Sequence, residues 1–540
     1  METFICWTVV LLYSAAMIYV GFYLKSKYNL GRNNIKEAGL EFWIARRQLP
    51  GWRLATSITS GWLMLGWIGF GMAQVYFYGA TGLWILPIPW FILCFIIIII
   101  VPFMRRVSAV SLPQAIEKRF GVSARVLLAI LSFGVFIAWT QAETYMAGAL
   151  MAPFLKIPQQ LCMVLFIIPI IIYTYLGGFR AIITTDLIQF CIMSVFMVIL
   201  AVAAIVVASD ASGGNLISAI GNSQPPWSGE GQAFKFGFLG WLFPFVLLIG
   251  YLPGWLIEQD LAIRLQSAKS TKEATKGAVL ALVLITVFVL ILPSITAFCA
   301  LVAFPPVNGA APEIIHSDAT GIISAFIGKM PFALIPFMLI GLVACQMSTV
   351  DTFANVSALA VSHDLVEPAL YKKGAKPETR LAVARYISVA VIVFSLVLAL
   401  INNKLGDVYY ISSGVLSASI AIPVMLIFWR RATLPAVLAA AIVGVLATVG
   451  VYYYEYKVLQ SIDANAPNYY ANVLPAFMKG AYGYYYVASG VVLSFITMVV
   501  VSLVTKKPSQ AQLSEVKDNP VDDYTEFSRE TTADIRESIK

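Results

Sequence analysis

Charged side chains are scarce in this chain. Asp, Glu, Lys and Arg make up 12% of its 540 residues, 60% of the residues are hydrophobic, and the mean hydropathy is +0.83. Soluble proteins carry roughly 25% charged residues. Apolar runs recur along the chain, and each is long enough to cross a hydrocarbon core about 30 Å thick. The composition therefore excludes an ordinary soluble protein and predicts an all-α polytopic membrane protein.

Side chains that perform catalysis are also few. The sequence holds six cysteines and two histidines. The cysteines lie in or beside apolar runs without CxxC or metal-ligand spacing, which favours buried structural thiols over disulfides. The histidines, His316 and His363, have no sequence neighbours that suggest a triad or a metal site. A phosphate loop, a nucleophile elbow and a dinucleotide fingerprint are all missing, so we expect no enzyme activity and no cofactor.

The hydropathy pattern predicts thirteen transmembrane segments. The first is too long for the apolar core of a signal peptide and has no small-residue cleavage site before Lys25, so we expect it to be retained. The predicted segments lie near residues 4–24, 50–80, 83–104, 123–152, 159–178, 182–208, 236–260, 275–304, 331–362, 381–402, 406–428, 432–454 and 481–504.

The loops between these segments differ in their content of Lys and Arg. Alternate loops and the tail hold 30 of the 36 cationic residues, which predicts that this side faces the cytoplasm. We therefore expect a multi-pass protein of the cell membrane with its N-terminus outside and its C-terminus in the cytoplasm. The net charge of +8 faces anionic lipid in this arrangement and needs no nucleic acid. The polar segment 505–540 has mixed charge and predicts a disordered cytoplasmic tail.

Two of the predicted segments contain helix-breaking residues at membrane depth. SGWLMLGWIGFGMAQ lies in the second segment and LLIGYLPGWLIEQD in the seventh. Broken helices in matching positions of two inverted halves are typical of secondary transporters, and the odd offset of five reverses the chain direction. The alternative is that Gly and Pro allow close helix packing. The pairing favours two five-helix repeats, and it divides the chain into 1–49 (first helix and basic loop), 50–208 and 209–428 (repeats), 429–504 (two peripheral helices) and 505–540 (tail).

A polar stripe interrupts the ninth segment, ACQMSTVDTFANVSALAVSHD. Six polar residues fall between positions 348 and 357, and Ser348, Asp351, Thr352 and Asn355 share one face of a helix. A polar stripe in a membrane helix must face a partner or a water-filled cavity. Hydroxyl and carboxylate oxygens suit a small alkali cation. The alternative is that the hydroxyls bond to the preceding turn and that the acids pair with loop arginines. The stripe therefore predicts cation transport rather than catalysis.

Four further stretches carry a resemblance to a known family. They are YTYLGGFRAIITTDLIQFCIM, IEQDLAIRLQSAKSTKEATKG, ACQMSTVDTFANVSALAVSHDL and ISSGVLSASIAIPVMLIFWRRATLPAVLAAAIVG. Together they resemble the sodium/solute symporter family. The resemblance implies a LeuT-type core of five plus five helices, with one extra N-terminal and two extra C-terminal helices. It also implies sodium-coupled symport of a small organic solute into the cell by alternating access, in a protein that we expect to act as a monomer.

The resemblance also assigns ion sites. The main sodium site would take the carbonyls of Thr56, Thr59 and Cys345 and the hydroxyls of Ser348 and Thr349, with Ser60-Gly61 just after the helix break. A second cation or proton site would involve Asp186, Asp351 and Thr352. Asp351 is a serine in several relatives with a second ion. Two neighbouring carboxylates could bind a cation, or one could hold a proton, which would favour proton coupling.

The substrate would lie between the broken helices, near Trp62, Leu63, Glu143, Trp255 and Glu258. Leu63 cannot form side-chain hydrogen bonds, which disfavours a sugar. Glu143 and Glu258 could face an amine, although Glu258 could equally pair with Arg264. A gate is predicted for the aromatic residues Trp62, Trp67, Trp139, Tyr251 and Trp255.

Three alternatives to sodium symport remain open from the sequence. The first is a proton-coupled symporter of the same fold, with Asp186 and Asp351 as the titrating pair. The second is a transporter-like solute sensor, which would require a signalling segment larger than residues 505–540. The third is a channel, which would show neither a coupling ratio nor saturation.

Overall fold

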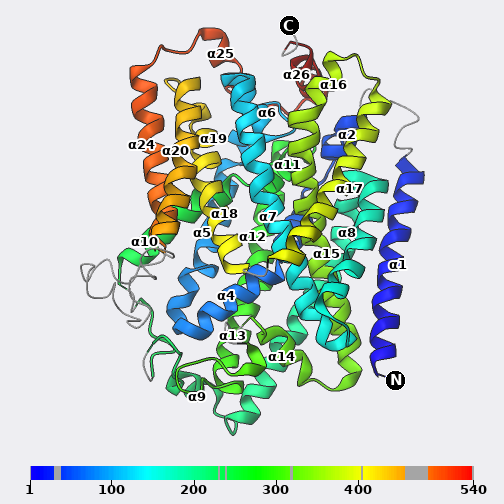
Figure 1. Ribbon diagram of the computed structural model, residues 1–540, viewed down its shortest axis with the longest axis vertical. Helices are drawn as coiled ribbons and strands as arrows, with labels where there is room; N and C mark the ends of the chain where they lie inside the picture. The colour runs from blue at the N-terminus through cyan, green and yellow to red at the C-terminus, as the bar shows by residue number, and fades with distance from the viewer. Residues whose placement is uncertain are drawn as a thin grey trace.

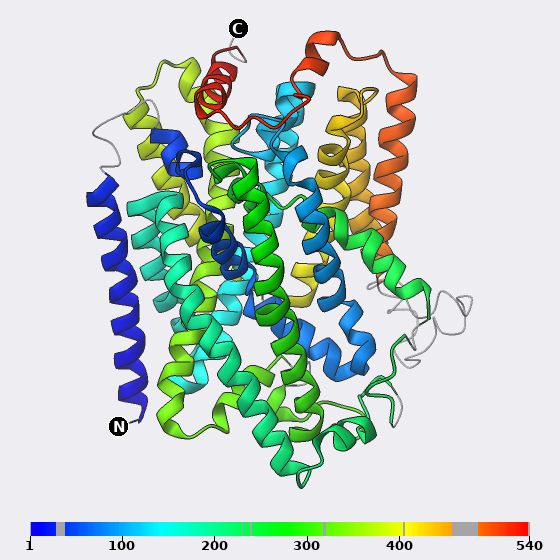
Figure 2. The ribbon, with the colours of Figure 1, turned by 180° about the vertical axis from the view of Figure 1, so that it is seen from behind.

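The computed structural model is built of helices. It describes residues 2–28, 38–228, 231–237, 240–316, 320–402, 405–455 and 484–537. Figures 1 and 2 show long helices packed side by side, with the N- and C-termini at opposite ends of the molecule. This placement agrees with an odd number of membrane crossings. Of the six cationic residues on the predicted outer side, Lys404, Lys457 and Lys479 lie outside the described residues.

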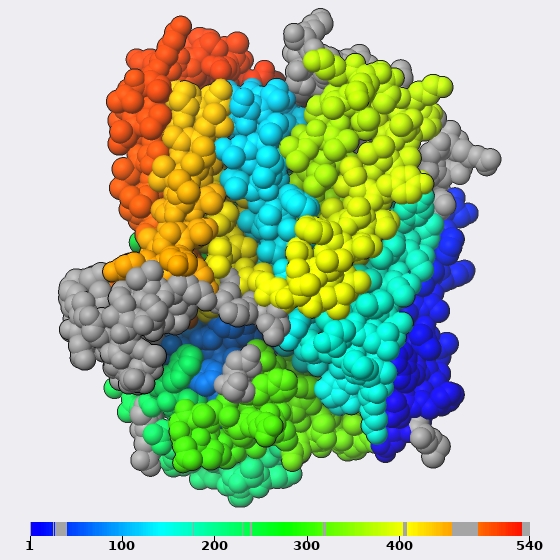
Figure 3. Space-filling model, viewed as in Figure 1, coloured from blue at the N-terminus to red at the C-terminus, as the bar shows by residue number. Residues whose placement is uncertain are grey.

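Eleven helices among the described residues are long and apolar enough to cross a membrane, and a bent pair could form a twelfth. Thirteen predicted spans become eleven or twelve by this measure for two reasons. The predicted segment 50–80 is divided into two shorter helices, and the predicted segment 236–260 corresponds to the bent pair. The eleven are Glu2–Leu24, Pro87–Met104, Val122–Leu155, Gln159–Leu176, Gly178–Ala211, Thr271–Ala303, Phe332–Lys372, Pro377–Ile401, Val408–Phe428, Leu434–Tyr453 and Tyr485–Val504. Figure 3 shows one face, on which α7 (Val122–Leu155) surfaces between α17 (Pro377–Ile401) and α20 (Leu434–Tyr453).

Two predicted spans meet without a loop at Gly178. Backbone hydrogen bonds run through α8 (Gln159–Ala211), but Gly178 has φ 56° and ψ −154°, which kinks the helix. A side chain at position 178 would also clash with a neighbour, since a Cβ would lie 2.5 Å from a ring carbon of Phe42. Glycine is the residue that adopts this conformation at no steric cost. The predicted division between 159–178 and 182–208 is therefore confirmed, with the glycine as its cause.

The first broken helix consists of α3 (Gly51–Trp62) and α4 (Leu65–Tyr78). Leu63 and Met64 lie between them with non-helical ψ angles of 56° and 103°. The predicted break before Ser60-Gly61 is wrong, because both residues belong to the last turn of α3. Gly61 does not break the helix. It leaves space for a neighbour, since a Cβ there would lie 2.8 Å from an Nη atom of Arg264.

The second broken helix consists of α10 (Leu242–Leu256) and α11 (Gln259–Ser267), which are bent by 43° relative to each other. Ile257 and Glu258 lie at the bend, and Glu258 adopts an extended conformation as the N-cap of α11. Gly250, Pro253 and Gly254 predicted a broken helix in this segment, but all three belong to α10 and the bend follows them. The division of the chain into repeats 50–208 and 209–428, flanked by 1–49 and 429–504, stays a prediction.

π-Helical turns interrupt membrane helices at η4 (Thr286–Ile291), η7 (Ala360–Val366) and η8 (Leu416–Ala421). Such turns add a residue to the helix and are frequent at functional sites. The η8 turn holds the second broken helix. The Gly254 amide donates to Ser417 Oγ at 3.1 Å, and Ser417 Oγ donates to the Tyr251 carbonyl at 3.3 Å. These two hydrogen bonds therefore connect α10 to η8.

The tail predicted to be disordered is folded against the end of the molecule that carries the C-terminus (Figure 1). It forms α25 (Gln510–Ser514) and α26 (Tyr524–Glu537), and Phe527 is fully buried beneath the guanidinium of Arg47, 4.2 Å from the ring centroid. Asp522 Oδ1 accepts from Arg105 Nη2 at 3.0 Å and from the Thr271 amide at 2.9 Å. The polar composition predicted disorder. Composition does not reveal that Phe527 and Asp522 have binding partners elsewhere in the chain, and these contacts hold the tail in place.

The attachment of the tail should weaken when the charge of Asp522 is lost. Partial burial acts to raise the pKa of Asp522, but hydrogen bonds from Thr271 and the charge of Arg105 outweigh it and lower this pKa below its ordinary value. A lowered carboxyl pKa stabilises the folded state above the ordinary value of about 4, and this stabilisation disappears as the pH falls through the folded-state pKa.

We expect Asp522→Asn to speed amide hydrogen exchange several-fold around Val521, whose amide donates to the Arg105 carbonyl at 2.9 Å. Asp523→Asn is the matched control, because its Oδ1 accepts from the Thr525 amide and an asparagine oxygen can do the same. Equal exchange at residue 521 in both variants and the parent at neutral pH would contradict the role of the Asp522 charge.

Candidate functional site

The centre of α15 (Ile335–Leu359) contacts the last turn of α3. Ser348 Oγ lies 3.1 Å from the Ser60 carbonyl and 2.9 Å from the Cys345 carbonyl, and Thr349 Oγ1 donates to the Cys345 carbonyl at 3.0 Å. These four residues are fully buried. The geometry thus places two hydroxyls and two carbonyl oxygens together between the two helices, which is a set of hard, neutral donors.

The remaining two predicted sodium ligands lie in the same helix as Ser60. Thr56 and Thr59 turn their hydroxyls to their own helix: Thr59 Oγ1 donates to the Ala55 carbonyl at 2.9 Å. The Leu63 amide donates to the Ser60 carbonyl, three residues earlier in the chain. In a continuing α-helix this amide would donate to the Thr59 carbonyl, four residues earlier. Sequence reasoning missed the Ser60 carbonyl. Its spacing of four from Thr56 places it on the same helix face.

The predicted second cation site contains a guanidinium. Arg264 Nη2 donates to Thr352 Oγ1 at 2.8 Å and lies 3.5 Å from Asp186 Oδ2. Arg264 also bonds Asp260 Oδ2 at 3.2 Å, so its salt-bridge partners among the described residues are Asp186 and Asp260. The sequence left a pairing of Arg264 with Glu258 open as one of two alternatives. The structure instead turns Arg264 into the helix bundle, where Asp186 and Thr352 lie.

Asp351, the third predicted residue of that site, has a different partner. Its Oδ2 accepts from the hydroxyl of Tyr173 in α8 at 2.6 Å. Asp351 and Asp186 interact electrostatically, and each keeps one buried oxygen, Oδ1, without a hydrogen-bond partner among the described residues. The sequence left open that the membrane acids pair with a loop arginine, but it did not identify Arg264 as the partner of Asp186. It gave no sign of Tyr173, which lies 178 residues from Asp351 in the chain.

Glu143 holds the start of α4. Its Oε2 accepts from the Gly66 amide at 3.1 Å, and its Oε1 accepts from the hydroxyl of Tyr409. A carboxylate at the N-terminus of a helix satisfies free amides and is favoured by the helix dipole. Gly66 is required for this approach, since a Cβ would lie 2.8 Å from Glu143 Oε1. Glu143, which the sequence predicted to contact the substrate, therefore stabilises the start of α4 at the first break.

Tryptophans from four helices connect the two breaks. Trp90 of α5 (Pro87–Met104) lies 5.4 Å from Trp62 and 6.0 Å from Trp255 between ring centroids, and Trp67 lies 6.0 Å from Trp255. Tyr251 stacks on Trp255 at 5.1 Å. Four of the five predicted gate residues thus form one cluster, to which the structure adds Trp90.

Trp139, the fifth predicted gate residue, lies apart from these contacts. Its indole donates to Ser412 Oγ at 2.8 Å, and its ring packs on Phe136 and Phe353.

Of the predicted substrate residues, Leu63 lies at the first break and Glu258 at the second, and both are buried. Trp62 ends α3, and its indole donates to Asp260 Oδ2 at 3.1 Å. The structure therefore brings residues of both broken helices within one buried region.

All six cysteines are free, and Cys191 alone among them is exposed.

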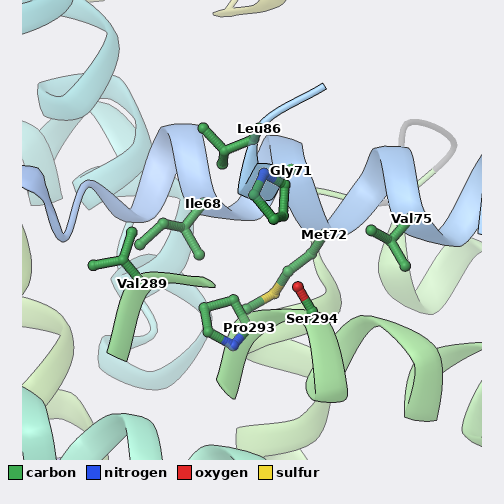
Figure 4. Close-up of a pocket in the computed structure, with 9 residues that line it drawn as sticks. Ile68, Gly71, Met72, Val75, Leu86, Val289, Pro293 and Ser294 are labelled. Carbon is green, nitrogen blue, oxygen red and sulfur yellow. The ribbon is translucent and has the colours of Figure 1, made fainter. Parts of the chain in front are cut away.

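A small pocket lies beside α4, away from these polar groups. Figure 4 shows Met72 of α4 pointing toward Pro293 and Ser294, and Val75 of the same helix also lines the pocket. The lining is apolar apart from Ser294, whose hydroxyl donates to the Leu290 carbonyl at 2.6 Å. It lacks the polar groups that would recognise a water-soluble solute, so it is not a good candidate for the substrate site.

Two helices broken at membrane depth, a buried set of neutral oxygens between α3 and α15, and an aromatic cluster between the breaks define a secondary transporter of the broken-helix class. The comparison of structures agrees. A sodium-coupled sialic acid symporter, solved in a substrate-bound outward-open state, aligns with a TM-score of 0.69 over 94% of this chain and 99% of its own, at 20% identity. The fold is therefore of the LeuT type.

The model of the Sodium:solute symporter family matches residues 42–444. The chain belongs to this family, and it is a sodium-coupled solute transporter and not an enzyme. Among similar proteins, a sodium/sialic acid symporter of Aliivibrio fischeri is 25% identical over 81% of this chain and 85% of its own length. A sodium/glucose cotransporter of Vibrio parahaemolyticus is 24% identical over 81% and 82%, and an osmoregulated proline transporter of Bacillus subtilis is 23% identical over 93% and 95%.

Proposed function

We propose that a sodium ion binds between α3 and α15. The observation that carries this proposal is the position of the Ser348 hydroxyl, which lies within hydrogen-bond distance of carbonyls from both helices. An ion in this place would draw on the hydroxyls of Ser348 and Thr349 and the carbonyls of Cys345 and Ser60. The Thr56 and Thr59 carbonyls on the neighbouring surface of α3 would complete its shell.

The ion would couple to the solute through the first broken helix. Sodium that joins α3 to α15 would hold the end of α3 in place, and with it Trp62 and Leu63 at the break. When α3 separates from α15, the two sets of oxygens separate and the ion is released. This sequence of events supports symport into the cell by alternating access.

The solute site would lie between the two breaks, at Trp62, Leu63, Trp255 and Glu258. The indole N–H groups of Trp67 and Trp90 are buried without an acceptor among the described residues. Buried donors favour a ligand that accepts hydrogen bonds, and the aromatic rings favour an apolar face. We infer a small organic solute with both features. The relatives are named for transport of sialic acid, glucose and proline, so they do not narrow the solute to one chemical class.

Glu143 would support the solute site from behind. Both of its oxygens are engaged, by the Gly66 amide and the Tyr409 hydroxyl. An amine on the solute would therefore compete with existing bonds. This favours a positioning role for Glu143 over direct pairing with an amine.

The orientation follows the distribution of charge. Figure 1 places α2 (Ala38–Ile44), α6 (Leu112–Phe120) and α16 (Glu367–Lys372) at the same end as the C-terminus. Basic residues lie in or beside these helices, which supports a cytoplasmic C-terminus and an outer N-terminus in the cell membrane. We propose that the monomer is the functional unit.

Proton coupling has less support. The alternative needs Asp186 and Asp351 as a titrating pair, but Asp186 bonds Arg264 and Ser57, and Asp351 bonds Tyr173. A sodium ion at the neutral site therefore remains the better-supported coupling ion.

Thermal unfolding in detergent tests the proposal without a known solute. We expect sodium chloride to raise the unfolding temperature above the values in potassium and choline chloride at equal ionic strength. A ligand at a hundred times its dissociation constant stabilises a protein by about 2.7 kcal/mol. Equal stability in the three salts, together with a pH dependence that Asp186→Asn or Asp351→Asn removes, would instead establish proton coupling.

A further inference from the structure

A cavity separates part of the first helix from the rest of the bundle. Figures 1 and 2 show α1 (Glu2–Tyr28) at the edge of the molecule, where it packs on α8 and also contacts α7 and α15. Near the C-terminal end of α1 the packing is close, since a Cβ at Gly21 would lie 2.8 Å from Cβ of Tyr173 in α8. Nearer its N-terminus, α1 instead leaves a cavity of about 340 Å³ against these helices.

The cavity has a buried wall and an exposed rim. Met151 of α7, Phe166 of α8 and Val343 of α15 belong to the wall and are each at most 7% exposed. Leu11 of α1 and Ile168 of α8 belong to the rim and are 59% and 44% exposed. These helices are long and apolar enough to cross the membrane, so the exposed rim faces the hydrocarbon of the bilayer. The cavity therefore opens to lipid.

The shape and the lining of the cavity favour a hydrocarbon chain. The lining residues of α1 run from Trp7 to Ile18, a rise of about 16 Å along the helix. Of the described residues in the lining, Ser14 alone carries a hydroxyl, and the indole of Trp7 already donates to the Leu155 carbonyl at 3.2 Å. A buried water molecule needs several polar partners, and apolar cavities of roughly 150 Å³ already stay dry and take up apolar ligands. A long apolar cavity beside the bilayer is therefore suited to an acyl chain.

A cation marks one end of this cavity. Leu155 and Ile157 both line it, and Lys156 lies between them at the C-terminal cap of α7. Lys156 is exposed and has no ion-pair partner in the described part of the chain. The bond from Trp7 to Leu155 places this cation at the end of the cavity nearest the N-terminus of α1. A lysine at a membrane surface attracts anionic lipid headgroups.

We propose that this cavity binds an anionic phospholipid, with one acyl chain between α1 and α8 and the phosphate at Lys156. The chain fills the space that α1 leaves and contacts α7, α8 and α15 together. The lipid thereby attaches the N-terminal part of the first helix to the bundle, whereas Gly21 attaches the other part by direct packing. The lipid site shares no residue with the proposed sodium and solute sites.

Fluorescence quenching of Trp7 tests the proposal. The purified full chain in detergent micelles is titrated with phosphatidylglycerol that carries brominated acyl chains, because bromine quenches an indole only at close range. The signal of Trp7 is the difference between each protein and its Trp7→Phe version, and we expect it to saturate in the parent. Ala15→Leu places a larger side chain in the cavity. It should raise the lipid concentration for half-maximal quenching at least about tenfold, the change that roughly 1.4 kcal/mol of overpacking produces.

The next residue of the helix provides the matched control. Ala16 is exposed like Ala15 but does not line the cavity, so Ala16→Leu should keep the parental value. Quenching that does not saturate in the parent, or equal values in Ala15→Leu and Ala16→Leu, would mean that Trp7 meets only bulk lipid and would overturn the site.

Lys156→Gln separates the headgroup from the chain, and it remains informative if Ala15→Leu does not fold. It should raise the half-maximal concentration of phosphatidylglycerol about fivefold, as expected for the loss of one cation beside an anionic headgroup. The value for a diacylglycerol with the same brominated chains, which lacks the phosphate, should not change. Equal values for phosphatidylglycerol in Lys156→Gln and the parent would overturn the assignment of the phosphate to Lys156.

Discussion

Ser348→Ala should weaken sodium binding by about 10- to 100-fold, since a hydrogen bond or ligand contact to a charged group contributes about 1.5–3 kcal/mol. The substitution removes the hydroxyl that lies 3.1 Å from the Ser60 carbonyl and 2.9 Å from the Cys345 carbonyl. It leaves the helix intact, because alanine is the best helix former. The sodium concentration that gives half-maximal thermal stabilisation measures the change.

A matched control lies on the same helix. Ser357 is fully buried like Ser348, but its hydroxyl donates to the Phe353 carbonyl of its own helix at 2.9 Å. The nine-residue spacing places it on the opposite face, at 100° per residue. Ser357→Ala should keep the parental sodium dependence. An equal shift in both variants would mean that the effect comes from the helix and not from an ion ligand.

Gly254→Ala should lower the unfolding temperature strongly. A Cβ at this position would lie 2.4 Å from Ser417 Oγ, 2.8 Å from Ser417 N and 3.0 Å from Ser417 Cα. The backbone of the π-helical turn η8 cannot move aside as a flexible side chain could, and overpacking typically costs about 1–3 kcal/mol. Displacement of α10 would also lengthen the bond from the Gly254 amide to Ser417 Oγ.

Two comparisons isolate the cause of this effect. Gly134→Ala in α7 is the control, because nothing lies within 4 Å of a Cβ there. The double variant Gly254→Ala/Ser417→Ala removes the clashing hydroxyl and keeps the two backbone contacts, so it should recover only part of the loss. Full recovery would show that the hydroxyl alone limits the space, and an unfolding temperature like that of Gly134→Ala would refute the tight packing of α10 on η8.

The helical segments and the broken helices were predictable because their signals are local. Runs of apolar residues and a Pro-Gly pair in a membrane segment depend on a few neighbours in sequence. The position of the first break was less predictable. The sequence predicted a break beside Gly61. In the structure this glycine instead leaves space for the side chain of Arg264. Asp186, a partner of Arg264, lies 78 residues earlier in the chain.

Long-range contacts account for what the sequence did not predict at the site. The stripe on α15 was visible from helical spacing, and the structure places Ser348 against α3. The bond of Asp351 to Tyr173 spans 178 residues, and the bond of Glu143 to Tyr409 spans 266. Nothing in the local pattern distinguishes these tyrosines from other aromatic residues of the bundle, so the partners of the buried acids appear only in three dimensions.

The anchored tail has a consequence for the biosynthesis of the protein. Arg105 is translated 417 residues before Asp522, and Arg47 precedes Phe527 by a longer interval still. Both arginines belong to the face that the tail covers, and chains fold largely in the order in which they are made. This face therefore cannot reach its final form during translation of the helices. Its completion is a late step, after the ribosome has synthesised the residues that hold it together.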